Sequence, residues 1–179
     1  MSYRIGLDLG GTKVLGIVTD NEHKVVHRKK HRLSNRTDIS AVMDQISNVY
    51  FELEGQLGNE KIASVGIALP SPVDNKLGHA KHLTAFQEKE LPVRAMLKER
   101  TGVDIKLGND VNMATLAEYK FGAGRGVLSL FTFYPGTGLG GGYIYEGRLV
   151  TGFNSTAAEI GHVVIDIDGP LCKCGRHGC

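Results

Sequence analysis

The sequence of 179 residues contains no tryptophan, only five prolines and only three cysteines. No run in it approaches the ~20 apolar residues that a membrane-spanning helix needs, so no contact with a membrane is predicted. The N-terminus enters a strand-like apolar pattern at once and has no signal-peptide hydrophobic region, which predicts a cytoplasmic protein. The formal net charge of +2 gives no general attraction for nucleic acid.

The three cysteines are gathered at one end of the sequence. Cys172, Cys174 and Cys179 all lie after residue 171. In a reducing compartment such a cluster indicates a metal site before a disulfide. The alternatives are unconnected thiols or a redox pair. A histidine, either His162 or His177, could complete a set of one nitrogen and three thiolates, which suits structural zinc.

Hydrophobic periodicity predicts a mixture of strands and helices. The three segments 3–8, 14–18 and 24–30 read as an antiparallel meander. The basic run 23–32 within it is interpreted as a solvated edge strand protected by its lysines. Apolar residues spaced by three and four predict a helix over 38–53. Further strands are expected at 62–69, 103–107, 127–134 and 143–145, with helices at 92–100 and 111–121 and a stiff loop at 70–72.

A strand, glycine turn and strand occur twice, first around 8–12 and again at 128–145. This repetition predicts two related lobes. Gly122, Gly124 and Gly126 are interpreted as a flexible hinge between them, so the predicted lobes are residues 1–121 and 122–179.

The two glycine loops favour phosphate binding over other uses. Gly136, Gly138 and Gly141 satisfy the pattern of a dinucleotide fingerprint, but that motif must open a helix, and residues 142–145 have strand propensity. No P-loop pattern occurs. Either loop alone could be an ordinary hairpin turn. Two loops rich in glycine and threonine can hold a polyphosphate through backbone N–H groups, with Asp8 beside the first to position Mg²⁺.

Asp110 ends one predicted strand and begins a helix. Capping a helix is a common role for aspartate at such a position. The functional alternative is a general base that takes a proton from a sugar hydroxyl during phosphoryl transfer. The spacing of the residues leaves the two interpretations equally open.

Together these motifs resemble the ROK family (repressors, open reading frames and sugar kinases) of the actin-like ATPase superfamily. The similar segments are Asp8–Lys13 (first phosphate motif), Leu69–Asp74 (sugar-side loop), Asn109–Asn112 (catalytic motif), Gly136–Gly142 (second phosphate motif), Glu159–His162 (sugar motif) and Cys172–Cys179 (zinc motif). They cover essentially the whole chain in family order. The resemblance implies an α/β, two-lobed actin-like ATPase (ribonuclease H-like) fold whose second lobe is incomplete here.

The resemblance also implies an ATP-dependent sugar kinase of the glucokinase type, with Mg²⁺ bound to ATP and a structural Zn²⁺. Asp110 would be the catalytic base. The implied sugar-binding residues are Asn109, Glu159, His162, Ser71 and His82. Those for phosphate and Mg²⁺ are Asp8, Gly10, Gly11, Thr12, Lys13, Gly136, Thr137, Gly138, Gly140 and Gly141. The implied zinc ligands are His162, Cys172, Cys174 and Cys179. Zinc on one ring nitrogen of His162 would leave the other N–H to point at a sugar hydroxyl.

Three departures from the family pattern bear on substrate and completeness. Ser71 stands where glycine is usual, and His82 and Phe86 lie where asparagine and tryptophan are common. The sugar therefore stays open, with glucose preferred over N-acetylmannosamine or allose. Family members continue beyond the last zinc ligand, so the chain is expected to be a fragment, inactive or weakly active alone, and a homodimer at full length.

Two other functions compete with the kinase. One is a sugar-sensing transcriptional regulator of the same family, but no helix-turn-helix precedes Asp8 and no basic recognition element is evident. The other is a truncated sugar-binding protein without catalytic activity.

Overall fold

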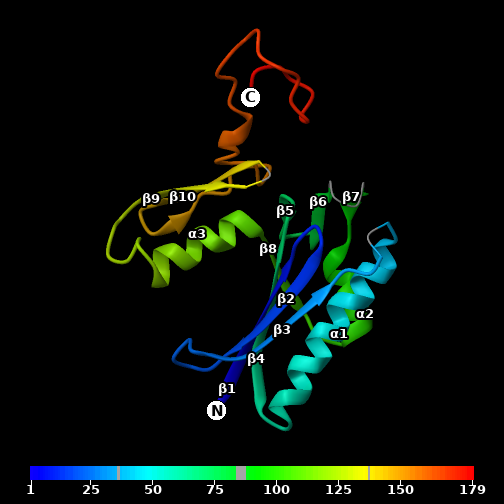
Figure 1. Cartoon of the computed structure of the whole chain (residues 1–179). Coiled ribbons are helices and arrows are strands. Elements are labelled where there is room, and N and C mark those ends of the chain that lie inside the picture. Colours follow the sequence, from blue (N-terminus) through cyan, green and yellow to red (C-terminus); the bar gives the residue numbers. More distant parts are fainter. Residues whose placement is uncertain (36, 84–87, 137) are drawn as a thin grey trace. The chain divides into compact units, whose positions relative to one another are not determined.

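The computed structural model describes residues 1–35, 37–83, 88–136 and 138–179 (Figure 1). It divides into two compact units, Met1–Asp110 and Val111–Cys179. This division falls at the start of α3 (Asp110–Phe121), whereas the boundary drawn from the glycines lies at the other end of the same helix. The functional lobes 1–121 and 122–179 therefore stay a prediction.

A five-stranded sheet forms the centre of the first unit, in the order β3-β2-β1-β4-β8. The strands are β1 (Ser2–Leu9), β2 (Lys13–Thr19), β3 (Val25–Arg32), β4 (Lys61–Leu69) and β8 (Ile105–Asn109). The first three form the antiparallel meander that the sequence predicts. β4 runs parallel to β1, and β8 runs parallel to β4. Parallel pairing is possible because a helix precedes each of these strands and returns the chain across the sheet.

Helix α1 (Ile39–Leu57) covers one face of this sheet. Asp38 caps its N-terminus by accepting hydrogen bonds from the N–H groups of Ser40 and Ala41. The helix buries an apolar stripe made of Val42, Met43, Ile46, Val49, Tyr50, Leu53 and Leu57. Close packing depends on Gly16 of β2, because a Cβ atom there would lie 2.6 Å from Leu53 Cδ1. The helix predicted over 38–53 is thus confirmed and runs one turn further.

The second helix of this unit, α2 (Val93–Thr101), is tied to α1 by polar contacts. Arg100 donates to Asp44 at 2.6 Å and to Ser40 Oγ at 2.7 Å. The helix ends at Gly102, which adopts a left-handed conformation with φ of 73° and donates to the Lys98 carbonyl. Between β4 and α2 lies a small antiparallel sheet of β5 (Val73–Asp74), β6 (His79–Leu83) and β7 (Glu88–Leu91). The sequence did not predict it, because strands of two to five residues are too short to show a clear alternation.

The second unit is built on a three-stranded antiparallel sheet, in the order β11-β10-β9. Its strands are β9 (Leu130–Pro135), β10 (Leu139–Tyr145) and β11 (Arg148–Leu149). Helix α3 packs on one face, where a Cβ atom on Gly140 would lie 2.7 Å from Val111 and one on Gly142 would overlap Thr115. Glycines 140–142, expected in a loop, are therefore part of β10. Beyond β11 the only regular helix among the described residues is a 3₁₀ turn, η2 (Ile160–His162).

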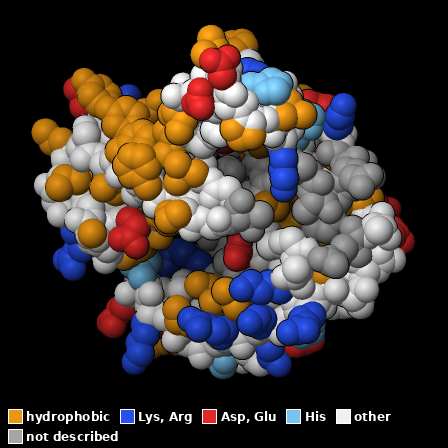
Figure 2. Space-filling model, turned by 45° about the horizontal axis from the view of Figure 1, so that its top comes forward, with side chains coloured by type: hydrophobic (Ala, Val, Ile, Leu, Met, Phe, Trp, Pro, Cys, Tyr) orange, Lys and Arg blue, Asp and Glu red, His pale blue; other side chains and the backbone are white. Residues whose placement is uncertain are grey.

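The opposite face of this second sheet is rich in exposed aromatic side chains. Phe131, Phe133 and Tyr145 are 40%, 64% and 51% exposed. Phe131 lies 5.0 Å from Phe133 and 5.8 Å from Tyr143 between ring centroids. Hydrophobic side chains gather over a broad area in the view of Figure 2. Across the described part of the chain, no helix is both long and apolar enough to cross a membrane.

Candidate active site and metal centre

The carboxyl edge of the five-stranded sheet brings three of the predicted motifs together. Asp8 of β1 is paired with Ala68 of β4, and Leu69 is paired with Asn109 of β8. The first glycine turn, the loop after β4 and the segment 109–110 therefore leave the sheet at neighbouring points. Ligands of open α/β sheets commonly bind at this edge.

The first glycine turn joins β1 to β2. Gly10 donates its N–H to the Lys13 carbonyl at 2.9 Å, and the Thr12 carbonyl accepts from Leu33 at 3.0 Å. Gly11, Thr12 and Lys13 are exposed. The turn is thus anchored at both sides while its tip faces solvent, as a loop that binds an anion requires.

Two carboxylates lie near this turn. Burial raises the pKa of Asp8, the negative charge of Asp110 raises it further, and the ammonium group of Lys13 lowers it. Asp8 and Asp110 therefore share one electrostatic environment within the first unit. A pair of carboxylates suits either a divalent cation, which takes oxygen ligands, or proton transfer.

Asn109 connects Asp110 to the loop after β4. Its side-chain amide donates to Asp110 Oδ1 at 3.0 Å and to the Ser71 carbonyl at 3.3 Å. One carboxylate oxygen of Asp110 is thereby held in a fixed direction. Asp110 is also the first residue of α3, one position after the cap, where a negative charge is favoured at the positive end of the helix dipole.

Ser71 is only 2% exposed, and its hydroxyl is used within the protein. It donates to the Pro72 carbonyl at 2.9 Å and accepts from the His82 N–H at 3.0 Å. This pair joins the loop after β4 to the small sheet, whereas the His82 side chain is exposed. Phe86 lies outside the described residues.

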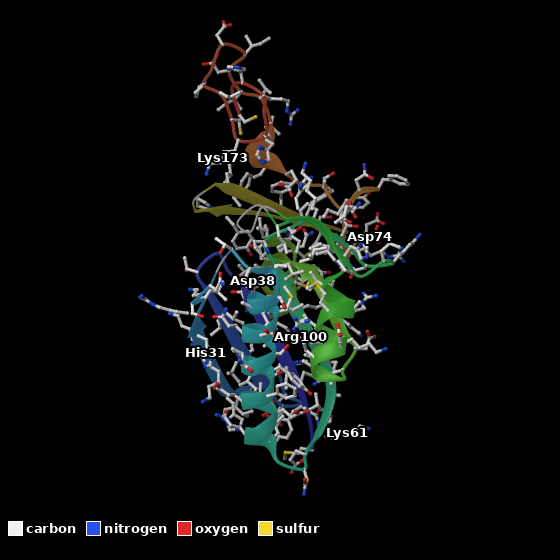
Figure 3. The ribbon with its side chains drawn as sticks, turned by 90° about the vertical axis from the view of Figure 1, so that its right-hand side faces the viewer. His31, Asp38, Lys61, Asp74, Arg100 and Lys173 are labelled. Atoms are coloured by element: carbon white, nitrogen blue, oxygen red, sulfur yellow. The ribbon has the colours of Figure 1, made fainter. Side chains whose placement is uncertain are left out.

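The second glycine loop joins β9 to β10, and Gly136 donates to the Gly138 carbonyl at 2.8 Å. Thr137 lies outside the described residues. A cavity of about 820 Å³ lies beside this loop, and its lining includes Gly136, Gly138, Tyr134, His162 and Lys173 (labelled in Figure 3). The Tyr134 hydroxyl is buried and has no hydrogen-bond partner among the described residues. The sequence analysis missed this residue, although a tyrosine directly before a glycine loop was visible.

The cysteine cluster has the geometry of a metal site. One ligand atom each from His162, Cys172, Cys174 and Cys179 lies within 4.8 Å of the other three. His162 Nδ1 is 3.5 Å from Cys172 Sγ, and Cys174 Sγ is 3.6 Å from Cys179 Sγ. One imidazole nitrogen and three thiolates fit a closed tetrahedral zinc site. His177 is directed elsewhere, with its Nδ1 3.1 Å from the Gly169 carbonyl.

Arg176 supports this cluster from the loop between the cysteines. Its guanidinium donates to the His162 carbonyl at 3.2 Å, and its own carbonyl accepts from Cys172 at 2.7 Å. Its backbone N–H and its guanidinium both bond the Cys174 sulfur, which lowers the pKa of Cys174 to about 6. Arg176 therefore contacts three of the four candidate ligands. The sequence analysis did not single it out, and its sequence position alone does not distinguish it from Lys173, which also lies between the cysteines.

The predicted sugar-binding residues are divided between the two units. Ser71, His82 and Asn109 belong to the first. Glu159 and His162 belong to the second, where Glu159 immediately precedes η2 and His162 ends it. The Glu159 side chain is exposed.

Comparison with known proteins gives consistent results. Residues 4–179 match the ROK family. A crystal structure of a ROK family glucokinase from Streptomyces griseus, in complex with glucose and AMPPNP, is 33% identical with a TM-score of 0.85, over 99% of this chain and 55% of that one. The N-acetylmannosamine kinase of Pasteurella multocida is 35% identical over 98% of this chain and 57% of its own. The DNA-binding transcriptional repressor Mlc of Escherichia coli is 29% identical over 99% of this chain and 44% of its own. The chain thus spans about half the length of these relatives.

Proposed function

The chain belongs to the ROK family, and on this basis we propose that it acts as a sugar kinase that transfers the γ-phosphoryl group of ATP to a hexose hydroxyl. The observation that carries the proposal is the meeting of Asp8, the Ser71 loop and Asn109–Asp110 at one edge of the sheet. Phosphoryl transfer depends mainly on positioning and on charge stabilisation. A supported carboxylate beside an exposed glycine turn suits both needs.

In this proposal Asp110 is the general base. It accepts the proton of the sugar hydroxyl as that oxygen attacks the γ-phosphorus and the bond to ADP breaks. The hydrogen bond from Asn109 at 3.0 Å fixes the orientation of this carboxylate. Asn109 itself is proposed to contact a sugar hydroxyl, as the family resemblance implies. When bound with ATP, Mg²⁺ neutralises charge on the phosphate oxygens, and Asp8 is the residue that would help to hold it.

The two glycine turns would bind phosphate oxygens through their backbone N–H groups. Gly10, Gly11 and Thr12, followed by Lys13, are proposed for the first turn, and the stretch from Gly136 to Gly141 for the second. The relative with bound glucose and AMPPNP supports this type of substrate pair. An N-acetylhexosamine is the second candidate acceptor, because an N-acetylmannosamine kinase is 35% identical to this chain.

We assign the zinc a structural role. His162, Cys172, Cys174 and Cys179 would hold it, and the closed set of four protein ligands leaves no position for substrate. By fixing the His162 ring, the site would orient the other ring nitrogen toward a sugar hydroxyl. A homodimer and a cytoplasmic location stay predictions from the sequence.

A sugar-sensing regulator is the second candidate function, since Mlc is 29% identical over nearly the whole chain. A kinase phosphorylates its sugar and releases ADP, whereas a sensor only binds the sugar. The test is a coupled assay of ADP release on the complete reading frame with glucose and with N-acetylmannosamine, beside calorimetric measurement of sugar binding. Sugar binding with no turnover would favour the sensor.

The decisive variant is Asp110→Asn. Loss of a general base commonly lowers the rate by ~10²–10⁴, while sugar affinity should stay within a few-fold. Asp104→Asn serves as the control, since Asp104 is an exposed aspartate of the same unit. Turnover by Asp110→Asn close to that of the control would refute the assignment.

A further inference from the structure

We propose that Cys174 and Cys179 form a reversible disulfide in the presence of hydrogen peroxide, and that this disulfide removes two ligands of the candidate zinc site. The two sulfur atoms lie 3.6 Å apart, and Cys174 is the exposed member of the three cysteines. Disulfides of reducing compartments are usually transient and sense oxidants. The cluster would then be a metal site when reduced and an oxidation site when peroxide is present.

Cys172 is the less suitable partner for such a disulfide. Its sulfur lies 3.5 Å from His162 Nδ1, and its backbone N–H donates to the Arg176 carbonyl at 2.7 Å. Cys172 also lies near Cys174, but only Lys173 separates the two residues. A disulfide between them would have to be closed by one residue that lacks the conformational freedom of glycine.

The loop between Cys174 and Cys179 is better suited to closure. It contains residues 175–178, and Gly175 and Gly178 have φ of 87° and 77°. Glycine adopts such left-handed conformations without a steric cost. The backbone of this loop can therefore adjust as the two sulfur atoms approach bonding distance.

The reaction balances with hydrogen peroxide as the oxidant. The Cys174 thiolate attacks one peroxide oxygen, the O–O bond breaks and hydroxide leaves, which converts Cys174 to a sulfenic acid. The Cys179 thiolate then attacks the Cys174 sulfur, forms the S–S bond and displaces a second hydroxide. The two sulfur atoms together lose two electrons, and peroxide gains these electrons as it becomes two hydroxide ions.

Arg176 makes Cys174 the expected point of attack. Its backbone N–H and its guanidinium both bond the Cys174 sulfur. Reactive cysteines typically lie in partly exposed, electropositive surroundings. Cys174 meets both conditions, whereas Cys172 and Cys179 are half-buried. We therefore expect peroxide to react first with Cys174.

The segment around the cluster has no hydrophobic core of its own. Between residues 161 and 179, all of which the structure describes, only two glycines are buried. Ile165, Ile167 and Leu171 are 86%, 83% and 68% exposed. After η2 the structure describes no helix, and no strand longer than an isolated bridge (Figure 1). Loss of two metal ligands should therefore loosen the whole segment.

The consequence for sugar binding rests on the proposed function, in which the metal orients the His162 ring. Release of the metal would free this ring and weaken sugar affinity. The release itself needs neither sugar nor ATP. Zinc and disulfide measurements on the 179-residue chain therefore test the oxidation site independently of the kinase assignment, and a negative result would leave that assignment intact.

The test adds hydrogen peroxide to the zinc-loaded chain and follows zinc release with a chromophoric chelator. Trypsin cuts after Lys173 and Arg176, so each cysteine lies on a separate peptide and mass spectrometry identifies the disulfide. One zinc should leave for each Cys174–Cys179 disulfide formed. The oxidised chain should lose more zinc affinity than the roughly 10- to 100-fold that supporting residues contribute, because two ligands themselves are lost. Reduction with dithiothreitol should restore zinc binding.

Four results would overturn the proposal. They are a Cys172–Cys174 disulfide, a disulfide between two chains, oxidation of Cys174 to sulfinic acid, which dithiothreitol does not reverse, and a chain that holds no zinc before oxidation.

The matched variants are Cys172→His and Cys179→His. Both leave two thiolates and two imidazoles, a set that structural zinc accepts. Only Cys172→His keeps both reacting thiols, so it should release zinc on oxidation and regain it on reduction, as the wild type does. Cys179→His should lose this reversibility, because the partner thiol of Cys174 is gone, and equal reversible release from both variants would overturn the proposal. If either variant fails to bind zinc, the peptide map of the wild type decides.

Discussion

Replacing Arg176 with glutamine should weaken zinc binding about tenfold. Residues that hydrogen-bond the ligands of a metal without binding the metal themselves typically contribute 10- to 100-fold to the metal affinity. Arg176 donates to the His162 carbonyl at 3.2 Å and bonds the Cys174 sulfur. Its side chain lies in water, which weakens both contacts, so the lower end of that range is expected. The backbone contacts of residue 176 stay in the variant, which limits the loss further.

The assay is competition for zinc against a chromophoric chelator, at several pH values. Because the guanidinium helps to lower the pKa of Cys174 to about 6, its loss should raise that pKa and make zinc binding weaken at a higher pH than in the wild type. Below that pKa the Cys174 thiol holds a proton, and this proton competes with the metal for the sulfur. At pH values above the Cys174 pKa of both proteins, the zinc affinities of wild type and variant should differ least.

The control is Lys173→Gln, which removes the same charge from the same loop. Lys173 lies between two ligands in sequence, and its side chain lines the neighbouring cavity. An equal loss of zinc affinity in both variants would show that net charge, and not the two contacts, is responsible. Arg176→Lys should recover part of the loss, since it keeps the charge but not the planar guanidinium.

Three further outcomes are expected. Gly16→Ala should destabilise the first unit by about 1–3 kcal/mol through overpacking against Val49 and Leu53. Gly55→Ala, at an open position of α1, should stabilise it by about 0.5–1 kcal/mol. Urea unfolding measures both changes in the free energy of unfolding, and changes of the same sign would contradict the packing argument. Because burial and Asp110 raise the pKa of Asp8, the folded state holds the Asp8 proton more tightly than the unfolded state, and the free energy of unfolding falls as the pH rises from the unfolded pKa through the folded pKa. Asp8→Asn should therefore raise the free energy of unfolding at pH 7 but not at pH 3. A gain at both pH values would exclude ionisation of Asp8 as the cause. Cys174→Ser should lose bound zinc, measured by mass spectrometry on protein purified without chelator, and one zinc per chain in that variant would argue against the ligand set.

Long periodic segments were predictable from the sequence. The apolar residues of α1 recur every three or four positions, and the meander β1–β2–β3 has short polar or glycine turns between its strands. The start of β10 could not be predicted from the sequence, because Gly140, Gly141 and Gly142 have low strand propensity when considered alone. Their place in a strand follows from tertiary packing: side chains at Gly140 and Gly142 would collide with Val111 and Thr115 of α3, and one at Gly141 would collide with Ala158 and Ile160. Such a tertiary contact leaves no local signal.

The candidate site likewise has features that the sequence predicted and features that it could not predict. Asp8, Asp110 and the four candidate metal ligands were named from motifs, and the structure brings the carboxylates into one electrostatic environment and the candidate ligand atoms within 4.8 Å of one another. The internal use of the Ser71 hydroxyl and the contacts of Arg176 were not predictable. Both depend on backbone groups whose positions are set only once β6 and the cysteine loop have formed.

The aromatic face of the second sheet affects how this chain can be handled. Phe133 at 64% exposure lies beside Phe131, with Tyr145 on the neighbouring strand at 51%. Dyes that become fluorescent on apolar surfaces should therefore bind the folded chain, so a melting curve followed with such a dye would begin from a high signal. The sequence contains no tryptophan, so intrinsic fluorescence would come from tyrosine alone, in part from Tyr50 in the first unit's core and in part from Tyr145 in this sheet. Circular dichroism or calorimetry is the appropriate way to follow unfolding of this protein.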